Sequence, residues 1–138
     1  MISSHVFLDA NVIIYAFDET SAYFSQTVEK IQQLQSTNTL LCSSHHVIEE
    51  VVHIMRKANI SAVEVIKKVA TLPNLVLVEP DALLAFAERY AKLSDELNMG
   101  VNDALLLQLI VDTDIKHLFS YDKQFVAKAA QLGIKQIA

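Results

Sequence analysis

Glycine, proline and cysteine are scarce in this sequence of 138 residues, which contains two, two and one of them. Because glycine and proline are the usual residues of turns and irregular segments, their scarcity predicts short loops and a chain rich in regular structure. The single cysteine, Cys42, excludes an internal disulfide, and its apolar neighbours predict a buried thiol. These features fit a protein of the reducing cytoplasm.

Positive charge is scarce as well, since 11 lysines and arginines stand against 16 aspartates and glutamates, which gives a net charge of −5. A chain with this balance repels a phosphate backbone at long range. A general basic field therefore cannot provide affinity for nucleic acid. Any chemistry on nucleic acid would need cations within the site.

Long hydrophobic runs are missing too. The longest apolar run, Ala104 to Val111, is interrupted by Gln108. Residues 1–7 show no basic segment followed by an apolar stretch. We therefore expect neither a secretion signal nor a membrane span.

Hydrophobic residues, in contrast, are plentiful and make up 52% of the sequence. The length lies close to the commonest domain size, long enough to bury a core and too short for a second domain. We therefore expect one domain over residues 1–138. The hydrophobic share is slightly high for a globular chain, which is consistent with a surface partly covered by a second copy or by another protein.

Short apolar segments alternate with amphipathic helical patterns along the chain. The predicted strands are 6–8, 39–42, 75–78, 117–121 and 134–137, and the predicted helices are about 10–15, 21–35, 45–58, 61–70, 81–98, 102–111 and 123–132. This alternation is typical of βαβ units, whose right-handed crossovers place helices on both faces of a parallel sheet. The predicted fold class is α/β: a three-layer α/β/α sandwich around a central, mainly parallel sheet of about five strands.

Two aspartates, Asp9 and Asp122, come directly after predicted strands. In open parallel sheets, ligands bind beyond the carboxyl ends of the strands, at the point where the strand order reverses. Either aspartate could instead cap the helix that follows it, because Asp is a preferred N-cap residue. Their positions alone leave both explanations open.

A third candidate, Glu50, lies on the helix that Ser44 is expected to cap. At 100° per residue, Glu50 falls on the edge of the apolar stripe of that helix, whereas its neighbour Glu49 points well away. The stripe consists of Val47, Ile48, Val51, Ile54, Met55 and Ala58. Glu49 is therefore expected to be an ordinary solvated charge. Glu50 is either a functional acid or a charge at the rim of the core.

The fourth candidate, Asp103, leads an apolar helical face, because Leu106, Leu107 and Ile110 follow it at three, four and seven positions. Burying an ionised carboxylate costs several kcal/mol unless it is paired, hydrogen-bonded or bound to metal. The alternative is that Asn102 or Asp103 caps the start of this helix.

Four carboxylates from separate elements thus point to one edge of one sheet. Clustered carboxylates raise one another's pKa and are unstable without cations. Oxygen ligands with no thiol and no clear imidazole set suit Mg²⁺ or Mn²⁺. Such ions can deprotonate a water, orient it towards a phosphodiester and stabilise the leaving oxygen. They also reverse the local negative field that a phosphate would meet.

These acids lie in four segments that resemble the motifs of the PIN domain family, and within it the VapC-type ribonuclease toxins of bacterial and archaeal toxin–antitoxin pairs. The segments are 6–12 (VFLDANV), 44–50 (SHHVIEE), 102–106 (NDALL) and 119–125 (FSYDKQF). Each segment is short, but four in this order cover nearly the whole chain. The main departure is Ala10, where many relatives carry Thr or Ser, which removes a hydroxyl near the first acid but no metal ligand.

The resemblance implies a Mg²⁺- or Mn²⁺-dependent endoribonuclease that cleaves RNA, often as a homodimer, and that is inhibited by an antitoxin protein. We expect Asp9 and Asp103 to bind metal directly, and Glu50 and Asp122 to bind it directly or through water. Three further residues could orient these groups or a substrate phosphate, namely Asn11, Ser44 and Ser120. Water is expected to be the nucleophile, with no role for a reactive cysteine.

Three alternatives to this nuclease stay open. A transition metal could bind His46, Glu50 and His53, which fall on one side of the same helix. A phosphatase with Asp9 as nucleophile is disfavoured, because that chemistry commonly needs a second acid where Asn11 stands. The third alternative is a PIN-like module that binds RNA or protein without cutting.

For such a non-catalytic module, a modest basic surface could come from Lys57, Lys67, Lys68, Arg89 and Lys92. Scattered residues of this kind usually mark solvated helix faces. All four acids are present, which favours catalysis over binding alone. A nuclease of housekeeping RNA processing would carry the same acids, so the motifs do not separate it from a toxin.

Overall fold

A single parallel sheet forms the centre of the computed structural model, which describes residues 4–137. Its strands are β1 (His5–Leu8), β2 (Leu40–Ser44), β3 (Leu75–Val78), β4 (His117–Phe119) and β5 (Lys135–Gln136). They are arranged in the order β3-β2-β1-β4-β5, and every neighbouring pair is parallel. The predicted parallel sheet of five strands is confirmed.

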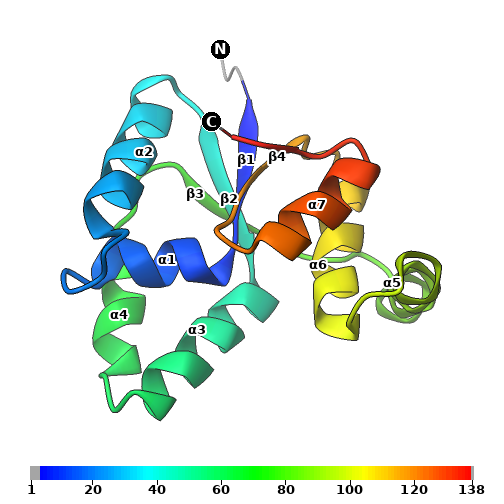
Figure 1. The fold of residues 1–138 in the computed structure, drawn as a ribbon, viewed down its shortest axis with the longest axis horizontal. Helices are drawn as coiled ribbons and strands as arrows, with labels where there is room; N and C mark the ends of the chain where they lie inside the picture. Colours follow the sequence, from blue (N-terminus) through cyan, green and yellow to red (C-terminus); the bar gives the residue numbers. More distant parts are fainter. Residues whose placement is uncertain (1–3, 138) are drawn as a thin grey trace.

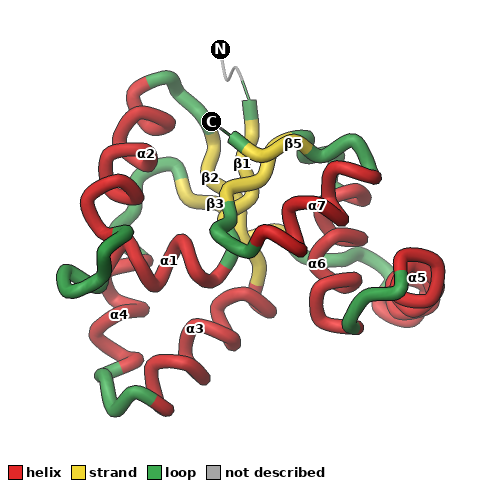
Figure 2. Tube along the Cα trace, in the orientation of Figure 1, coloured by secondary structure: helices red, strands yellow, loops and turns green. Residues whose placement is uncertain are grey.

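The helices form two layers around this sheet. They are α1 (Ala10–Phe17), α2 (Phe24–Ser36), α3 (His45–Lys57), α4 (Ala62–Val69), α5 (Leu83–Leu97), α6 (Val101–Asp112) and α7 (Lys123–Gln131). Figure 1 shows α1 to α4 gathered on one side of the strands and α5 to α7 on the other. The tube in Figure 2 shows the same separation, with the strands in the middle. The α/β/α sandwich predicted from the sequence is therefore confirmed.

Local hydrogen bonds explain where the helices begin. Ser44 and Ser61 each accept a hydrogen bond from the backbone N–H three residues later, as N-cap residues do. The second helix begins at Phe24 and not near Ser21 as predicted. The reason is that the Asp18 and Ser21 side chains accept hydrogen bonds from the backbone N–H groups of the residues two positions on, which holds this segment in turns.

The strand order reverses beside β1. From β1 the chain moves outward through β2 to β3, and it then returns to place β4 on the opposite side of β1. The helices that follow β1 and β4 therefore leave a crevice at the carboxyl ends of these two strands, which is where ligands bind in open parallel sheets. Asp9 directly follows β1, and Ser120 directly follows β4.

The core is built around the central strands. Val6, Phe7 and Leu8 of β1 and Leu118 of β4 are all buried, and they pack with apolar side chains of both helical layers. Cys42 is also buried, as predicted. Burial raises the pKa of its thiol to about 11. Within residues 4–137, no helix combines the length and apolarity that crossing a membrane requires.

Because Leu118 is fully buried between β1 and β5, Leu118→Ala is expected to lower the free energy of unfolding by about 2–5 kcal/mol. Urea unfolding followed by circular dichroism measures the change. The control is Val63→Ala on α4, where the side chain is 64% exposed and the expected change is within about 0.5 kcal/mol. Equal effects of the two substitutions would contradict this description of the core.

Candidate active site

Asp9 is the most buried of the four acids, with 8% of its surface exposed. Its Oδ1 accepts a hydrogen bond from the Ala10 N–H at 2.8 Å and thereby caps α1. Its Oδ2 accepts the Ser120 hydroxyl at 2.6 Å and the Asn11 amide at 3.4 Å. Burial raises the pKa of Asp9, and the negative charge of Asp122 raises it further, while the hydrogen bonds from Ser120 and Ala10 act in the opposite direction.

The segment after β4 lies against Asp9. The Ser120 hydroxyl, which is buried, donates to Asp9 and accepts the Asp122 N–H at 3.1 Å. Asp122 itself is exposed, and its Oδ1 caps α7 by accepting the N–H groups of Gln124 and Phe125, both at 3.1 Å. Asp9 and Asp122 therefore both cap the helices that follow them, as the capping interpretation predicted. Capping uses Oδ1 of each, and no described residue donates a hydrogen bond to Asp122 Oδ2.

Asn11 connects the two strand ends. Its amide nitrogen lies 3.4 Å from both Asp9 Oδ2 and Ser120 Oγ, and its Oδ1 accepts the Tyr121 N–H at 3.1 Å. Of the three residues predicted to support the acids, Asn11 and Ser120 thus contact Asp9 directly. Such contacts hold a carboxylate in one orientation, as hydrogen bonds to the ligand residues do in metal sites.

Glu50 and Asp103 reach the same place from α3 and α6. Together with Asp9 and Asp122, they line a pocket of about 250 Å³, which we call the acid pocket. Although Glu50 lies on the surface, partial desolvation raises its pKa, followed by the negative charges of Asp9, Asp103 and Asp122. Desolvation likewise raises the pKa of Asp103, followed by the charges of Asp122 and Asp9. The four acids predicted from the sequence therefore lie close enough together for their negative charges to interact.

The position of Asp103 follows from the apolar face that it leads. Leu106, Leu107 and Ile110 are all buried, as the spacing predicted. The N-cap of α6 is Gly100, and no side chain forms a capping hydrogen bond there. A capping role for Asn102 or Asp103 is therefore wrong, and capping does not explain this partly buried acid.

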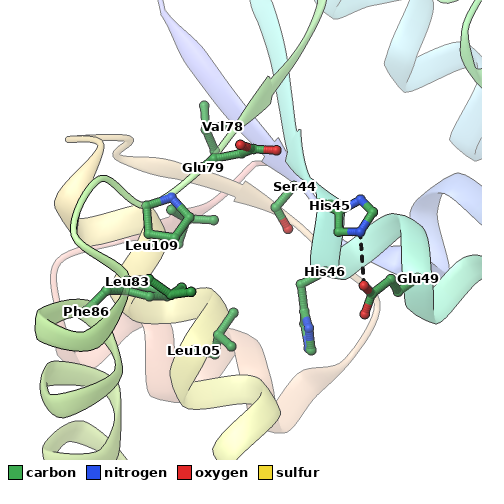
Figure 3. Close-up of a pocket in the computed structure, with 11 residues that line it drawn as sticks. Ser44, His45, His46, Glu49, Val78, Glu79, Leu83, Phe86, Leu105 and Leu109 are labelled. Carbon is green, nitrogen blue, oxygen red and sulfur yellow. Dashed lines mark ion pairs between the residues drawn. The ribbon is translucent and has the colours of Figure 1, made fainter.

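Glu49 and Ser44 are not among the residues that line the acid pocket. Glu49 forms an exposed ion pair with His45, at 3.0 Å between Oε1 and Nε2, which fits the solvated charge predicted for it. The Ser44 hydroxyl accepts the Val47 N–H at 3.2 Å. Both residues line a different pocket, of about 360 Å³, between the start of α3 and the apolar side chains of α5 and α6 (Figure 3). Support of a carboxylate by Ser44 stays a prediction, because its hydrogen bond goes to the α3 backbone.

The side chains that line the acid pocket do not converge on a single point. Among residues 4–137, no three His, Cys, Asp or Glu side chains are close enough together to hold a metal ion. This is true of the four acids and equally of His46, Glu50 and His53, which line a neighbouring pocket of about 480 Å³. The distances between the side chains therefore favour neither the four acids nor the set of two histidines and Glu50 as metal ligands.

The chemistry of the acid pocket nevertheless fits a hard divalent cation. Its wall consists of four acids, Asn11 and three apolar or aromatic residues, with no lysine or arginine. The raised pKa values of Asp9, Glu50 and Asp103 mean that ionising these acids together is costly without a positive charge nearby. Carboxylate and amide oxygens are the ligands that Mg²⁺ and Mn²⁺ prefer.

Three residues of the pocket wall were not predicted from the sequence: Ile14, Tyr15 and Ile54. Ile14 and Tyr15 stand three and four positions after Asn11 on α1, so they share its helical face. That spacing could have identified them. Ile54 follows Glu50 by four positions on α3 and could have been identified in the same way.

Comparison with known proteins gives a family match and several similar folds. The PIN domain family model matches residues 6–131. No curated protein matches the sequence.

Solved structures resemble the whole chain. VapBC2 from Rickettsia felis, bound to a DNA fragment from its promoter, has a TM-score of 0.71 at 18% identity, covering 96% of this chain and 97% of that one. VapC20 from Mycobacterium tuberculosis, a toxin that cleaves the sarcin–ricin loop, has a TM-score of 0.66 at 16% identity and covers 88% and 93%. VapBC-1 from nontypeable Haemophilus influenzae has a TM-score of 0.67 at 15% identity and covers 96% of each chain. At these identities the likeness shows the fold.

The raised pKa values predict a pH dependence for the metal-free protein. A carboxyl group whose pKa is higher in the folded state binds protons more tightly there, so its contribution to stability falls as pH rises above its unfolded pKa of about 4. Asp103→Asn removes one such group and is therefore expected to gain stability relative to the wild type as pH rises from about 4 to 7. Urea unfolding in the presence of chelator measures this difference at each pH.

The matched control for this measurement is Asp95→Asn, at an exposed position of α5. Its stability relative to the wild type is expected to stay constant over the same pH range. A constant difference for Asp103→Asn as well would contradict the electrostatic account of the pocket.

Proposed function

The chain belongs to the PIN domain family, and on that premise we propose that it is a metal-dependent endoribonuclease, the toxin of a toxin–antitoxin pair. The observation that carries this proposal is the gathering of Asp9, Glu50, Asp103 and Asp122 around one pocket at the strand-order reversal. The reaction is the hydrolysis of RNA phosphodiester bonds. We expect the protein to act in the cytoplasm.

In this proposal, the metal ligands are Asp9 and Asp103 directly, with Glu50 and Asp122 ligating directly or through water. Bound Mg²⁺ or Mn²⁺ would supply an activated water and positive charge for the phosphate and the leaving oxygen. The acids must be ionised to bind a cation, so metal affinity is expected to fall as pH falls. Among residues 4–137, no serine, cysteine or lysine lines the pocket, which supports water as the nucleophile.

Ser120 and Asn11 orient Asp9 for this task. Their two hydrogen bonds reach the same oxygen, Asp9 Oδ2, while Oδ1 is held by the start of α1. A carboxylate fixed on both sides loses little further freedom when it binds a cation. Asn11 also holds the Tyr121 backbone, so the loop that carries Asp122 is positioned relative to Asp9.

The toxin assignment and its partners rest on the similar structures. Two of them are VapBC complexes, and the third is the toxin VapC20. These likenesses support an antitoxin protein as partner of this chain. The homodimer and the RNA substrate rest on the resemblance of the motifs. The alternative of a nuclease in housekeeping RNA processing would use the same site.

A non-catalytic PIN-like binding module is the second candidate. The observation that favours it is that no three of the described acids lie close enough together to hold a metal in the present geometry. Such a module would bind RNA or protein and would leave RNA intact at every metal concentration. Cleavage assays separate it from the nuclease.

Glu50→Gln is expected to lower the rate of RNA cleavage at least about a hundredfold, because it removes a charge from the acid pocket. Asp9→Asn and Asp103→Asn are expected to do the same. The assay follows single-stranded RNA with Mg²⁺ or Mn²⁺, and chelator is expected to abolish cleavage. Circular dichroism checks that each variant is folded.

The neighbouring Glu49→Gln is the control for Glu50→Gln. It changes the same kind of charge on the same helix, but at an exposed ion pair with His45. It is expected to retain nearly the wild-type rate. Full activity of Asp9→Asn or Asp103→Asn would overturn the nuclease proposal, and absence of cleavage by the wild type on any RNA would favour the binding module.

Ser120→Ala is expected to weaken Mn²⁺ binding about 10- to 100-fold, because Asp9 loses its shortest hydrogen bond. Ser44→Ala is the matched serine substitution, and its expected effect is on stability, with a loss of about 0.5–2 kcal/mol from the capping of α3. Titration with Mn²⁺ and urea unfolding measure the two quantities. Equal Mn²⁺ affinities of the two variants would contradict the distinct roles assigned to these serines.

A further inference from the structure

Three tyrosines from separate segments meet beside the acid pocket. Tyr15 on α1 stacks on Tyr23, which precedes α2, with ring centroids 5.0 Å apart and an angle of 25° between the rings. Tyr121, after β4, contacts both at 5.4 and 4.9 Å. Phe119 lies behind Tyr121 at 5.5 Å. We call Tyr15, Tyr23 and Tyr121 the tyrosine cluster.

Within the tyrosine cluster, hydrogen bonds hold Tyr121, whereas Tyr23 is partly exposed to solvent. The Tyr121 hydroxyl shares a hydrogen bond of 2.6 Å with Thr27 on α2, and its N–H donates to Asn11. Tyr23, in contrast, is 44% exposed. Packing thus accounts for the position of Tyr121, whereas Tyr23 stays partly exposed to solvent.

Tyr15 connects the tyrosine cluster with the acid pocket. It belongs to the wall of the pocket that Asp9, Glu50, Asp103 and Asp122 line, and at the same time to the stack with Tyr23. A flat group seated against Tyr15 would therefore lie next to a phosphate held at the acids. The wall offers no lysine or arginine that could hold the rest of an RNA chain by charge.

We propose that the tyrosine cluster binds an unpaired nucleobase of the RNA next to the bond that is cleaved. This inference rests on the nuclease function proposed above and adds to it a base-binding surface beside the acids. Bases stack on aromatic rings without any positive charge, and every base has a face that can do so. Stacking therefore provides affinity without the general basic field that a net charge of −5 excludes.

The same argument excludes paired bases. A base within a duplex is already stacked on its neighbours and is not free to lie on Tyr15. The cluster is thus expected to select unpaired segments and to tolerate different bases, because stacking depends weakly on base identity. Any stronger preference for a sequence would have to come from other residues.

Tyr23→Leu and Tyr15→Leu test the proposal, since leucine keeps an apolar side chain but removes the ring. Each is expected to raise the KM for single-stranded RNA about fivefold to a hundredfold, with a smaller change in kcat. Tyr23→Phe and Tyr15→Phe keep the ring and are expected to restore the wild-type KM. This rescue separates stacking from a role of the hydroxyl groups.

A spectroscopic measurement detects the stack directly. The probes are short single-stranded RNAs with one 2-aminopurine at successive positions, mixed rapidly with protein and Mg²⁺. For one position near the cleaved bond, the wild type is expected to quench 2-aminopurine fluorescence before product forms. The Tyr23→Leu protein is expected to lose this quenching, and annealing a complementary strand to the RNA is expected to prevent it.

The control is Tyr90→Leu, which removes a tyrosine that packs edge-on against Phe86 on α5, away from the pocket. It is expected to leave KM and quenching unchanged. Wild-type cleavage combined with an unchanged KM and unchanged quenching in Tyr23→Leu would overturn the proposal, as would equal quenching of duplex RNA. If Tyr15→Leu does not fold, the KM and quenching of Tyr23→Leu, at an exposed position, decide whether the proposal holds. Absence of wild-type cleavage would instead overturn the nuclease function itself.

Discussion

The hydrogen bond from the Ser120 hydroxyl to Asp9 Oδ2, at 2.6 Å, joins the ends of β1 and β4, where the strand order reverses. The crevice at this reversal exists because the chain builds the sheet outward on one side of β1 before it returns to the other. Asn11 bonds to both sides of the same crevice. These bonds fix Asp9 and, through Asn11, the backbone of Tyr121 beside the pocket that the four acids line.

Electrostatics explains why such a junction favours a cation. Four acids line a pocket without a basic residue, and desolvation together with their mutual repulsion raises the pKa of Asp9, Glu50 and Asp103. A divalent cation would relieve this repulsion and would reverse, within the pocket, the negative field that a phosphate meets. The tyrosine cluster complements it, because stacking binds the uncharged part of a nucleotide.

Much of this could be predicted from the sequence, because the decisive patterns are local. The apolar runs located every strand, and helical spacing placed Asp103 on a buried face and distinguished Glu50 from Glu49. The role of Ser44 was harder, since a serine before a helix can bond either the backbone or a carboxylate. The strand order and the meeting of Tyr15, Tyr23 and Tyr121 depend on contacts between distant segments, which no local pattern encodes.

The proposed function requires the four acids together to form one site for a divalent cation. A crystal structure of the protein soaked with Mn²⁺ measures this, because anomalous scattering locates the ion. We expect Mn²⁺ in the pocket between Asp9, Glu50, Asp103 and Asp122, with these side chains moved inward to bind it. Mn²⁺ bound only elsewhere, or no bound ion at a saturating concentration, would show that the four acids do not form such a site.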